Sequence, residues 1–497
     1  MARVVVIGAG MGGMACAARL AALGHSVTIY EKARTWGGKL GTFRHDEFVF
    51  DTGPSLLTLP AVYRDLFLKT GRPLEDSVNL VDLDIAFRYQ FPDGTVLKMP
   101  GVGVGAATSA IGDALGGKSA EQWKLFMQRA SRMWAATRGP FLQSPLEGMR
   151  SLLALSWRIG DLRTIAPGKT LRTLAQHYFD DPRLVMLVDR YATYTGSDPR
   201  KAPAALATVP YIEQTFGTYH VAGGLRELGR AVYERCLALN VTINLGQGVH
   251  AIEASNAVTA VILDTGARIE CDIVVSNSDA KNTLNSLLPD STAQQKTKSA
   301  RLALAKNVPS LSGFVELLAL QGSSTDLAHH NVWFPSNYDA EFDAIFGAQP
   351  DPVLDPAIYV CAPKDAAMRP KDHESWFLLV NAPRHVPGLG VNWYDAELVV
   401  NYQRHLLDVL AKRGTDVRSR IQWSHTQTPA DLEFATSSPG GSIYGSSSNG
   451  MRSAFLRPTN KTKIANLYQV GGSSHPGGGL PLVAMSADIV ARMIGRA

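Results

Sequence analysis

The N-terminal residues alternate between strand and helix patterns in the order of a β-α-β unit. Arg3–Ile7 is a run of β-branched apolar residues, which predicts a buried parallel strand. Small and apolar residues at helical spacing follow from Met14 to Leu23, and Gly24 ends the predicted helix. Ser26–Tyr30 repeats the strand pattern and is followed by the acidic Glu31. This order predicts an α/β domain built on a parallel sheet.

Glycines occupy the turn between the first strand and the helix, in the pattern G-x-G-x-x-G from Gly8 to Gly13. Gly8 permits the tight turn, Gly10 lets a pyrophosphate approach the backbone, and Gly13 lets helix and strand pack closely. The helix N-terminus offers free N–H groups to the same anion. Glu31 can accept hydrogen bonds from ribose hydroxyls and repels a 2′-phosphate, which argues against NADP. A Rossmann-like dinucleotide site is therefore predicted at these residues: Gly8, Gly10, Met11, Gly12, Gly13, Glu31 and Lys32.

A second glycine pair, Gly37-Gly38, follows the acidic residue, and Lys39 comes next. The strand pattern Phe48–Asp51 then leads into a turn that contains Gly53 and Pro54. This stretch resembles the large flavoprotein group whose fingerprint continues from the acid to a Gly-Gly pair. The resemblance implies FAD rather than NAD, held by Gly37, Gly38, Lys39, Gly53 and Pro54. That group usually has Arg where this chain has Lys39, so the charge is kept and the planar fork is lost.

The middle of the chain returns to strand patterns. Tyr219–Leu225 leads into a helix, Val241–Leu245 reads as a short strand, and two strand runs on either side of Asp264–Gly266 read as a β-hairpin. Asp272–Asn277 reads as a buried strand. In FAD proteins such a segment completes the cofactor domain, and Val249 would meet the adenine side. Ordinary α/β structure without ligand contacts is the alternative for any single residue here.

The C-terminal segment combines a strand, a glycine-rich loop and a helix. Leu467–Val470 is the strand, the loop runs from Gly471 to Gly479, and the helix spans about 481–494. Glycines beside a helix N-terminus let the backbone approach a flat ligand, and the helix dipole favours negative charge on a reduced flavin. The expected cofactor contacts are Gly472, His475, Gly478, Gly479 and Leu480. His475 is also the candidate for proton transfer, with local packing as its alternative role.

The loop and its flanks resemble the C-terminal signature of the bacterial phytoene desaturase family, through Val470–Gly472 and His475–Val483. That family of FAD-dependent oxidoreductases includes carotenoid desaturases, carotenoid oxidases and retinol saturase. The likeness spans the chain, with further matching segments at Asp51–Pro54, Asp181–Leu184, Arg190–Tyr194, His329–Val332 and Ile358–Pro363. Arg190–Tyr194 is most similar to carotenoid 3,4-desaturases. Gly478 and Lys371–Glu374 depart from the pattern of many phytoene desaturases, which makes phytoene a less safe choice of substrate.

The resemblance implies a Rossmann-like FAD-binding domain with an interleaved α+β substrate domain and a helical membrane-facing region. The expected boundaries are 1–84, 217–289 and 452–497 for the first domain, and 85–216 and 290–451 for the second. It implies desaturation of a linear carotenoid, of the 3,4 type, or alternatively oxidation of a terminal methyl group to an aldehyde. A carotenoid must be taken from a bilayer, so membrane lipid is an expected partner, and the expected location is cytoplasmic and peripheral to the membrane.

The 120–157 region carries many large apolar residues, Trp123 and Trp134 among them, with arginines interleaved. An apolar helix face bordered by Arg and Trp suits a membrane interface. A helical cap domain with an ordinary core fits equally well, because periodicity does not separate a membrane-facing stripe from a buried one. Val4–Gly24 is also apolar, but no charged segment precedes it and its glycines serve the dinucleotide turn, so it is not read as a transmembrane helix.

Composition narrows the remaining possibilities. Apolar residues make up 45% and charged residues 19% of the 497 residues, which is a globular composition. The net charge of +5 suits anionic lipid and is too small to imply nucleic acid. Four cysteines without a C-x-x-C pair predict neither a zinc ribbon nor a redox motif, and indicate a reducing compartment. His329 and His330 are adjacent rather than four residues apart, so they are read as structural, and no metal site is expected.

Two rival functions share this fold pattern. An amine-oxidising flavoenzyme would have the same cofactor domain. A prenyl-protein escort would keep the architecture and bind isoprenoid chains without flavin turnover. The complete acid-ended fingerprint and the His475–Gly479 loop favour the flavin enzyme. The sequence leaves open which carotenoid is used, which bonds react, the final electron acceptor and the oligomeric state.

Overall fold

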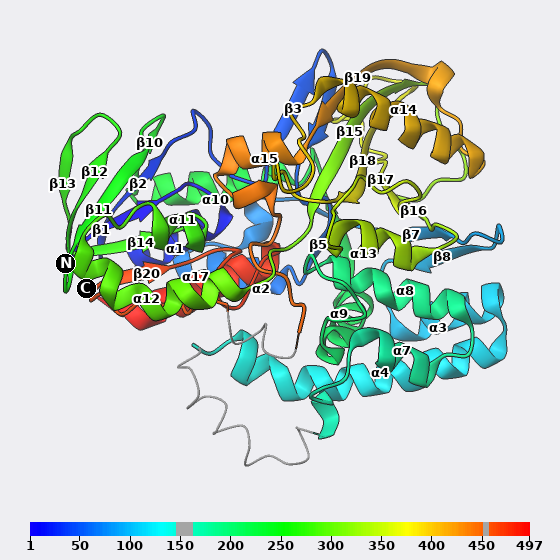
Figure 1. Cartoon of the computed structure of the whole chain (residues 1–497), viewed down its shortest axis with the longest axis horizontal. Helices are drawn as coiled ribbons and strands as arrows, with labels where there is room; N and C mark the ends of the chain where they lie inside the picture. The colour runs from blue at the N-terminus through cyan, green and yellow to red at the C-terminus, as the bar shows by residue number, and fades with distance from the viewer. Residues whose placement is uncertain (146–162, 451–456) are drawn as a thin grey trace.

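The computed structural model describes residues 1–145, 163–450 and 457–497. Figure 1 shows a parallel sheet at one end of the molecule, beside both chain termini, and a larger mixed sheet at the other end. A layer of helices lies below the mixed sheet. The parallel sheet belongs to the nucleotide-binding half of the chain. The mixed sheet and the helical layer form the second half, which faces it.

The parallel sheet is assembled from strands far apart in the sequence. Its order is β10 (Thr242–Leu245), β2 (Ser26–Glu31), β1 (Arg3–Ile7), β14 (Ile273–Ser276) and β20 (Leu467–Gln469). One face is covered by α1 (Met11–Ala22), α10 (Arg226–Ala238) and α17 (Leu480–Ile494). The other face packs against the antiparallel sheet of β11 (Val249–Ala254), β12 (Val258–Leu263) and β13 (Arg268–Glu270), and against α11 (Ala280–Asn285) and α12 (Ser291–Lys306). The predicted Rossmann-like layers and the predicted hairpin are therefore present.

The segment before α10 differs from its sequence interpretation. Thr218–Val221 forms strand β9, which pairs with β5 (Leu57–Thr58) and β6 (Leu80–Asp82), and α10 begins only at Arg226. The partners of β9 come from the first hundred residues, so no local pattern reveals the pairing. Asp51 accepts hydrogen bonds from the backbone N–H groups of Leu225 and Arg226, which fixes the start of the helix.

The mixed sheet has seven strands, all from 85–451. Its order is β19 (Ile421–Gln427), β15 (Ser312–Gln321), β18 (His373–Ala382), β17 (Ile358–Cys361), β16 (His330–Trp333), β7 (Ile85–Gln90) and β8 (Val96–Pro100). One face packs against α14 (Ala396–Lys412). The other face packs, through residues such as Leu317 and Phe377, against Phe48 and Phe50 of the hairpin of β3 (Thr42–His45) and β4 (Phe48–Asp51). We call this second face the inner face, because it lies against the nucleotide-binding half.

The helical layer packs on the β7–β8 edge of this sheet (Figure 1). It consists of α3 (Val104–Leu115), α4 (Gly117–Thr137), α7 (Leu171–Tyr178), α8 (Pro182–Thr193) and α9 (Thr208–Phe216). Short elements complete the fold: α2 (Ala61–Thr70), α13 (Tyr338–Phe346), α15 (Pro429–Thr436), the π-helical turn η2 (Arg138–Leu142), and the 3-10 turns η1 (Leu74–Asp76), η3 (Ala204–Ala207), η4 (Arg418–Arg420) and η5 (Pro439–Gly441).

The expectation that Trp123 and Trp134 face a membrane is wrong. Trp123 is fully buried and Trp134 is 6% exposed. Trp123 stacks on Phe179, and its indole N–H donates to Gln214. The described part of the region is therefore a helical cap with an ordinary core, the alternative that the sequence pattern had left open; residues 146–157 of the prediction lie outside the described residues. Within those same described ranges, no helix has both the length and the apolar character needed to span a bilayer.

Candidate flavin site and the facing inner face

The glycine turn at the start of α1 is packed so tightly that side chains cannot fit. A Cβ on Gly13 would lie 2.3 Å from the Gly8 carbonyl oxygen, and Gly8 itself has a φ of +95°. A Cβ on Gly10 would lie 2.6 Å from the side-chain nitrogen of Asn277. These contacts leave bare backbone at the N-terminus of α1, the arrangement that receives a pyrophosphate. The turn therefore fits a dinucleotide, as predicted.

Glu31 ends β2 next to this turn. Its carboxylate accepts hydrogen bonds from the backbone N–H groups of Ala9, at 2.7 Å, and Ala33, at 2.8 Å. The acid is thereby held at the carboxyl edge of the sheet, where a ribose lies in this fold. Lys32 follows it and its ammonium group donates to the Ser437 hydroxyl. Val249 begins β11 two residues after Gln247, whose N–H donates to the Glu31 carbonyl, so Val249 lies near Glu31 along the chain, and its contact with the adenine stays a prediction.

The second glycine pair returns to the first turn. Gly37 forms a bridge with Gly10, and a Cβ on Gly38 would lie 3.2 Å from the Gly10 Cα. Lys39 is half-buried, and its ammonium group donates to the backbone carbonyls of Ser442, at 2.8 Å, and Ile443, at 2.7 Å. Burial lowers the pKa of Lys39 to about 8. Two backbone carbonyls therefore accept from this ammonium group, at the position where the related flavoproteins usually have the planar guanidinium of Arg.

The turn after β4 packs closely against the backbone of Lys39. A Cβ on Gly53 would lie 1.8 Å from the Lys39 carbonyl oxygen, so only glycine fits there. Pro54 follows, and Ser55 then reaches across to the inner face of the mixed sheet. Residues 53–55 therefore occupy the boundary between the two halves of the chain.

The C-terminal glycine loop packs against Tyr444. A Cβ on Gly478 would lie 2.6 Å from the Tyr444 ring, and a Cβ on Gly472 would lie 3.4 Å from the Gly478 Cα. Gly479 precedes α17, and the Leu480 carbonyl accepts a hydrogen bond from the Tyr63 hydroxyl. The loop thus presents backbone next to a helix N-terminus, which matches the shape that a flat ring system needs.

His475 lies within this loop but is bound locally. Its Nε2 is 3.0 Å from the Ser144 carbonyl oxygen, and its own carbonyl accepts bonds from Asn460 and Ser486. Burial lowers the pKa of His475 to about 4, against the raising effect of Ser144. The imidazole is therefore neutral near pH 7, and its Nε2 already contacts the Ser144 carbonyl oxygen. These contacts support the packing role, and the proton-transfer role of His475 stays a prediction without a structural partner.

Two functional candidates were missed by the sequence interpretation. Asn277, at the end of β14, packs its side chain against Gly10, Gly12 and Gly471. Arg457 is buried beside the C-terminal loop and donates to the carbonyls of Gly472 and Ser446. The sequence signal that could have identified Asn277 is its place as a polar residue at the carboxyl end of a central strand. Arg457 carried no local sequence signal.

Arg190 is a buried cation on the inner-face side of the helical layer. Its guanidinium lies 5.2–5.9 Å from the ring centres of four aromatic residues, and it donates to the Tyr194 hydroxyl. These rings belong to Phe87, Tyr89, Tyr194 and Tyr359. The Tyr194 hydroxyl in turn donates to the buried Glu213 carboxylate at 3.1 Å. Cation–π contacts therefore hold this charge in place, in the Arg190–Tyr194 stretch that carried the resemblance.

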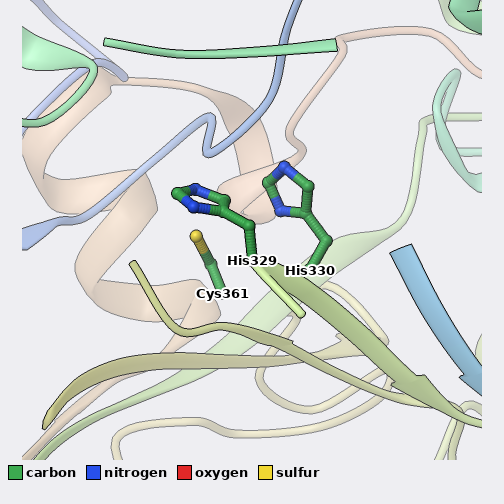
Figure 2. A group of neighbouring side chains, drawn as sticks. All are labelled: His329, His330 and Cys361. Atoms are coloured by element: carbon green, nitrogen blue, oxygen red, sulfur yellow. The ribbon is translucent and has the colours of Figure 1, made fainter. Parts of the chain in front are cut away.

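Histidines and a thiol gather beside this aromatic group. The donor atoms of His329, His330 and Cys361 all lie within 4.8 Å of one another, and Figure 2 shows the three side chains together on one side of β16 and β17. Burial lowers the pKa of His329 to about 3 and that of His330 well below its usual value. Burial also raises the pKa of the Cys361 thiol. The group is neutral near pH 7, and its position was not expected from the adjacent histidines alone.

The fold and the site define the class of protein, an FAD-dependent oxidoreductase. The model of the flavin containing amine oxidoreductase family matches residues 11–315. The chain belongs to this family.

Two curated relatives and one solved structure cover nearly the whole chain. The 1-hydroxycarotenoid 3,4-desaturase of Flavobacterium sp. (strain P99-3) is 33% identical, over 99% of each chain. The 4,4′-diapolycopene oxygenase of Methylomonas sp. is 32% identical, over 98% of this chain and 97% of its own. A structure of putrescine oxidase bound to putrescine has a TM-score of 0.66 at 13% identity, over 99% of each chain, and shows the fold alone. The family resemblance seen in the sequence is thus confirmed.

Proposed function

We propose that the protein is an FAD-dependent desaturase that introduces carbon–carbon double bonds into a linear carotenoid, with a preference for 3,4-desaturation. The single observation that carries the proposal is the full-length identity of 33% with a 1-hydroxycarotenoid 3,4-desaturase. The Arg190–Tyr194 stretch supports it, because this stretch lies against Tyr359 on the inner face, opposite the predicted flavin contacts.

Each part of the chain has a definable task in that reaction. When bound, FAD supplies a two-electron acceptor for hydride from the substrate. The turns at Gly8–Gly13 and Gly37–Gly38 hold its pyrophosphate, and Glu31 binds its ribose. Residues 53–55 and the Gly477–Gly479 loop present backbone to the ring system. The inner face carries buried aromatic and aliphatic side chains, the chemical character that an apolar polyene requires of its binding site.

A carotenoid terminal-methyl oxidase is the second candidate, favoured by the 32% identity with a 4,4′-diapolycopene oxygenase. The two reactions differ in product mass, since each desaturation removes two hydrogens and oxidation adds oxygen. The test is to incubate the protein with FAD and liposomes that carry neurosporene, lycopene or their 1-hydroxy derivatives, and to identify products by mass spectrometry. Loss of hydrogen alone supports the desaturase, and oxygen-containing products assign the oxidase. Turnover of an amine without turnover of any polyene overturns both.

We also propose that the protein acts at the membrane surface from the cytoplasm. The support is the solubility of the substrate, which is supplied by a bilayer and not by water. The protein is expected to co-sediment with anionic liposomes, consistent with a net charge of +5, and to be released by high salt. Liposome co-sedimentation at low and high ionic strength measures this. Protein that stays in the supernatant at low salt, with liposomes carrying the substrate, contradicts the proposal.

A further inference from the structure

A chain of hydrogen bonds crosses from the predicted flavin turn to the inner face. The Ser55 hydroxyl, directly after Pro54, lies 2.7 Å from the Tyr359 hydroxyl. The Tyr359 hydroxyl lies 2.8 Å from Nδ1 of His330. His330 and Cys361 are paired residues of β16 and β17, so their side chains share one face of the sheet. Three proton-bearing groups are therefore connected in series.

The other ring nitrogen of His330 is unpaired. Nε2 is fully buried and has no hydrogen-bond partner among the described residues. A buried polar atom without a partner costs free energy, and an imidazole nitrogen with a free lone pair can accept a proton. Its bonded neighbour Nδ1 is already occupied by Tyr359. Nε2 is therefore the nitrogen at which this chain of hydrogen bonds ends.

The surroundings of His330 oppose a positive charge on its ring. The titratable and charged groups that face it are His329, His220, Arg190, Tyr359 and Cys361. Burial is the largest cause of its lowered pKa, followed by His329 and Arg190. An imidazole in this place can take a proton at one nitrogen only if it releases a proton from the other. The geometry around the ring supplies such an exit, through Tyr359.

Building on the proposed function, we propose that His330 is the proton acceptor of the desaturation, and that Tyr359 and Ser55 pass the proton on. In the starting state the Nδ1–H group donates a hydrogen bond to the Tyr359 oxygen, and the Tyr359 hydroxyl donates one to Ser55. Nε2 carries no hydrogen and presents its lone pair to the substrate. A small cavity of about 20 Å³, lined in part by Ser55, His220 and His329, has room for one water molecule at the exit. His220 also contacts the part-exposed Asp365 at 2.9 Å.

Atoms and electrons balance along this route. Two C–H bonds of adjacent carbons break and one C=C bond forms. One hydrogen leaves with its electron pair to FAD, which is reduced, and the other leaves as a proton to Nε2 of His330. The Nδ1 proton moves to the Tyr359 oxygen, the Tyr359 proton to Ser55, and the Ser55 proton to the cavity. His330 stays neutral throughout, in keeping with its buried site beside Arg190.

A metal ion is the competing use of the same donors. Metal–ligand distances of about 2.0–2.3 Å place tetrahedral ligand atoms roughly 3.3–3.8 Å apart, closer than the 4.8 Å span of His329, His330 and Cys361. His330 would have to bind through Nε2 only, because Nδ1 faces Tyr359. The proton route uses the hydrogen bonds that Tyr359 already makes with His330 and Ser55, and metal content is an outcome of the test.

The experiment compares His330→Gln, Tyr359→Phe and Ser55→Ala with the wild-type holoprotein. Tyr359→Phe removes only the hydroxyl, so it stays informative if His330→Gln fails to fold. His177→Gln, an exposed histidine of α7, is the matched control. Bound FAD and thermal unfolding establish that each variant is loaded and folded. Anaerobic single-turnover flavin reduction by the polyene that the wild type converts is then measured in H2O and D2O, with substrate-deuterium effects alongside.

We expect His330→Gln to lower the flavin reduction rate by about 100-fold or more, the usual scale of general base catalysis. Tyr359→Phe and Ser55→Ala should lower it by about 10-fold and reduce the solvent isotope effect, while the substrate-deuterium effect persists. A merely structural role would not change the solvent isotope effect selectively. Nitrogen-15 NMR of the oxidised holoprotein, assigned with His330→Gln, should show the proton on Nδ1.

Several results overturn the proposal. They are a folded His330→Gln variant with near wild-type rate and isotope effects, a resting proton on Nε2, or one equivalent of bound transition metal by elemental analysis. If the wild type converts no polyene at all, the proposed function itself fails. Wild-type conversion with unaffected His330→Gln refutes the proton route alone, so the two failures are distinguishable.

Discussion

At the scale of single residues, the nucleotide turn depends on the absence of side chains. The Gly13 position is the most restrictive of the fingerprint, because a Cβ there would lie 2.3 Å from the Gly8 carbonyl oxygen. Relief of that overlap requires the turn to open, which moves the N–H groups that receive the pyrophosphate. The same argument applies to Gly53, whose Cβ would overlap the Lys39 carbonyl.

The residue-scale prediction is that Gly13→Ala weakens FAD binding at least tenfold, or by about 1.4 kcal/mol or more. Fluorescence titration of the apoprotein with FAD measures the effect. Gly105→Ala is the matched control, because nothing lies within 4 Å of its Cβ position in α3. Equal FAD affinity in the Gly13→Ala and Gly105→Ala proteins would show that this turn does not hold the cofactor.

At the scale of elements, α4 is a core helix and not a membrane-facing one. Its Trp123 is fully buried, whereas Leu125, two residues away, is 53% exposed. We predict that Trp123→Ala lowers the free energy of unfolding by about 3–5 kcal/mol, whereas Leu125→Ala changes it by less than about 0.5 kcal/mol. Denaturant unfolding of both variants measures this. A normally stable Trp123→Ala protein with impaired liposome binding would restore the membrane-facing interpretation.

Strand β15 carries a buried acid that couples stability to pH. Glu316 accepts bonds from Thr426 and Gln403, and burial raises its pKa to about 7. Its folded pKa exceeds its unfolded pKa of about 4.3, so its stabilising contribution is fully present below that lower value and is lost as pH rises through about 7. The protein should therefore lose stability between these values, by up to about 4 kcal/mol from this group.

Glu316→Gln tests this coupling, since an amide can accept from Gln403 and donate to Thr426. The variant should be more stable than wild type at pH 8 and show a flatter stability profile between pH 4.5 and 7. Thermal unfolding across that range measures both. An unchanged slope would show that Glu316 is ionised in the folded protein across this range.

At the scale of the whole molecule, the predicted cofactor contacts lie where the two halves of the chain meet. Lys39 and Ser55, from the nucleotide-binding half, bond to Ser442, Ile443 and Tyr359 of the other half. FAD bound along this boundary stabilises both, by about 2.7 kcal/mol at a hundredfold excess over its Kd. The melting temperature of the apoprotein should therefore rise by several degrees with added FAD. A melting temperature independent of FAD concentration would contradict the site.

We also predict that FAD is bound noncovalently, because no His or Cys of the sequence lies in a recognisable linkage motif. Acid precipitation should release the flavin into the supernatant, where its absorbance is measured. Flavin that stays with the precipitated chain would demonstrate a covalent bond to the protein.

The sequence alone determined the glycine turns and the main strands of the nucleotide-binding half. The fingerprint glycines, Glu31 and the strand–turn–helix order depend on interactions between residues that are close in the sequence. Each of these positions therefore tolerates few other residue types. The hairpin at Asp264–Gly266 and the C-terminal helix follow from local patterns for the same reason.

Only the tertiary structure decided the chemistry of the inner face. Ser55, Tyr359 and His330 lie up to 304 positions apart in the chain, and His475, in a conspicuous motif, is bound by Ser144. The burial of Trp123 was equally undetermined, because an apolar helical stripe has one periodicity whether it meets a protein core or a bilayer. Side-chain contacts between distant segments follow from packing of the whole chain, and no local pattern records them.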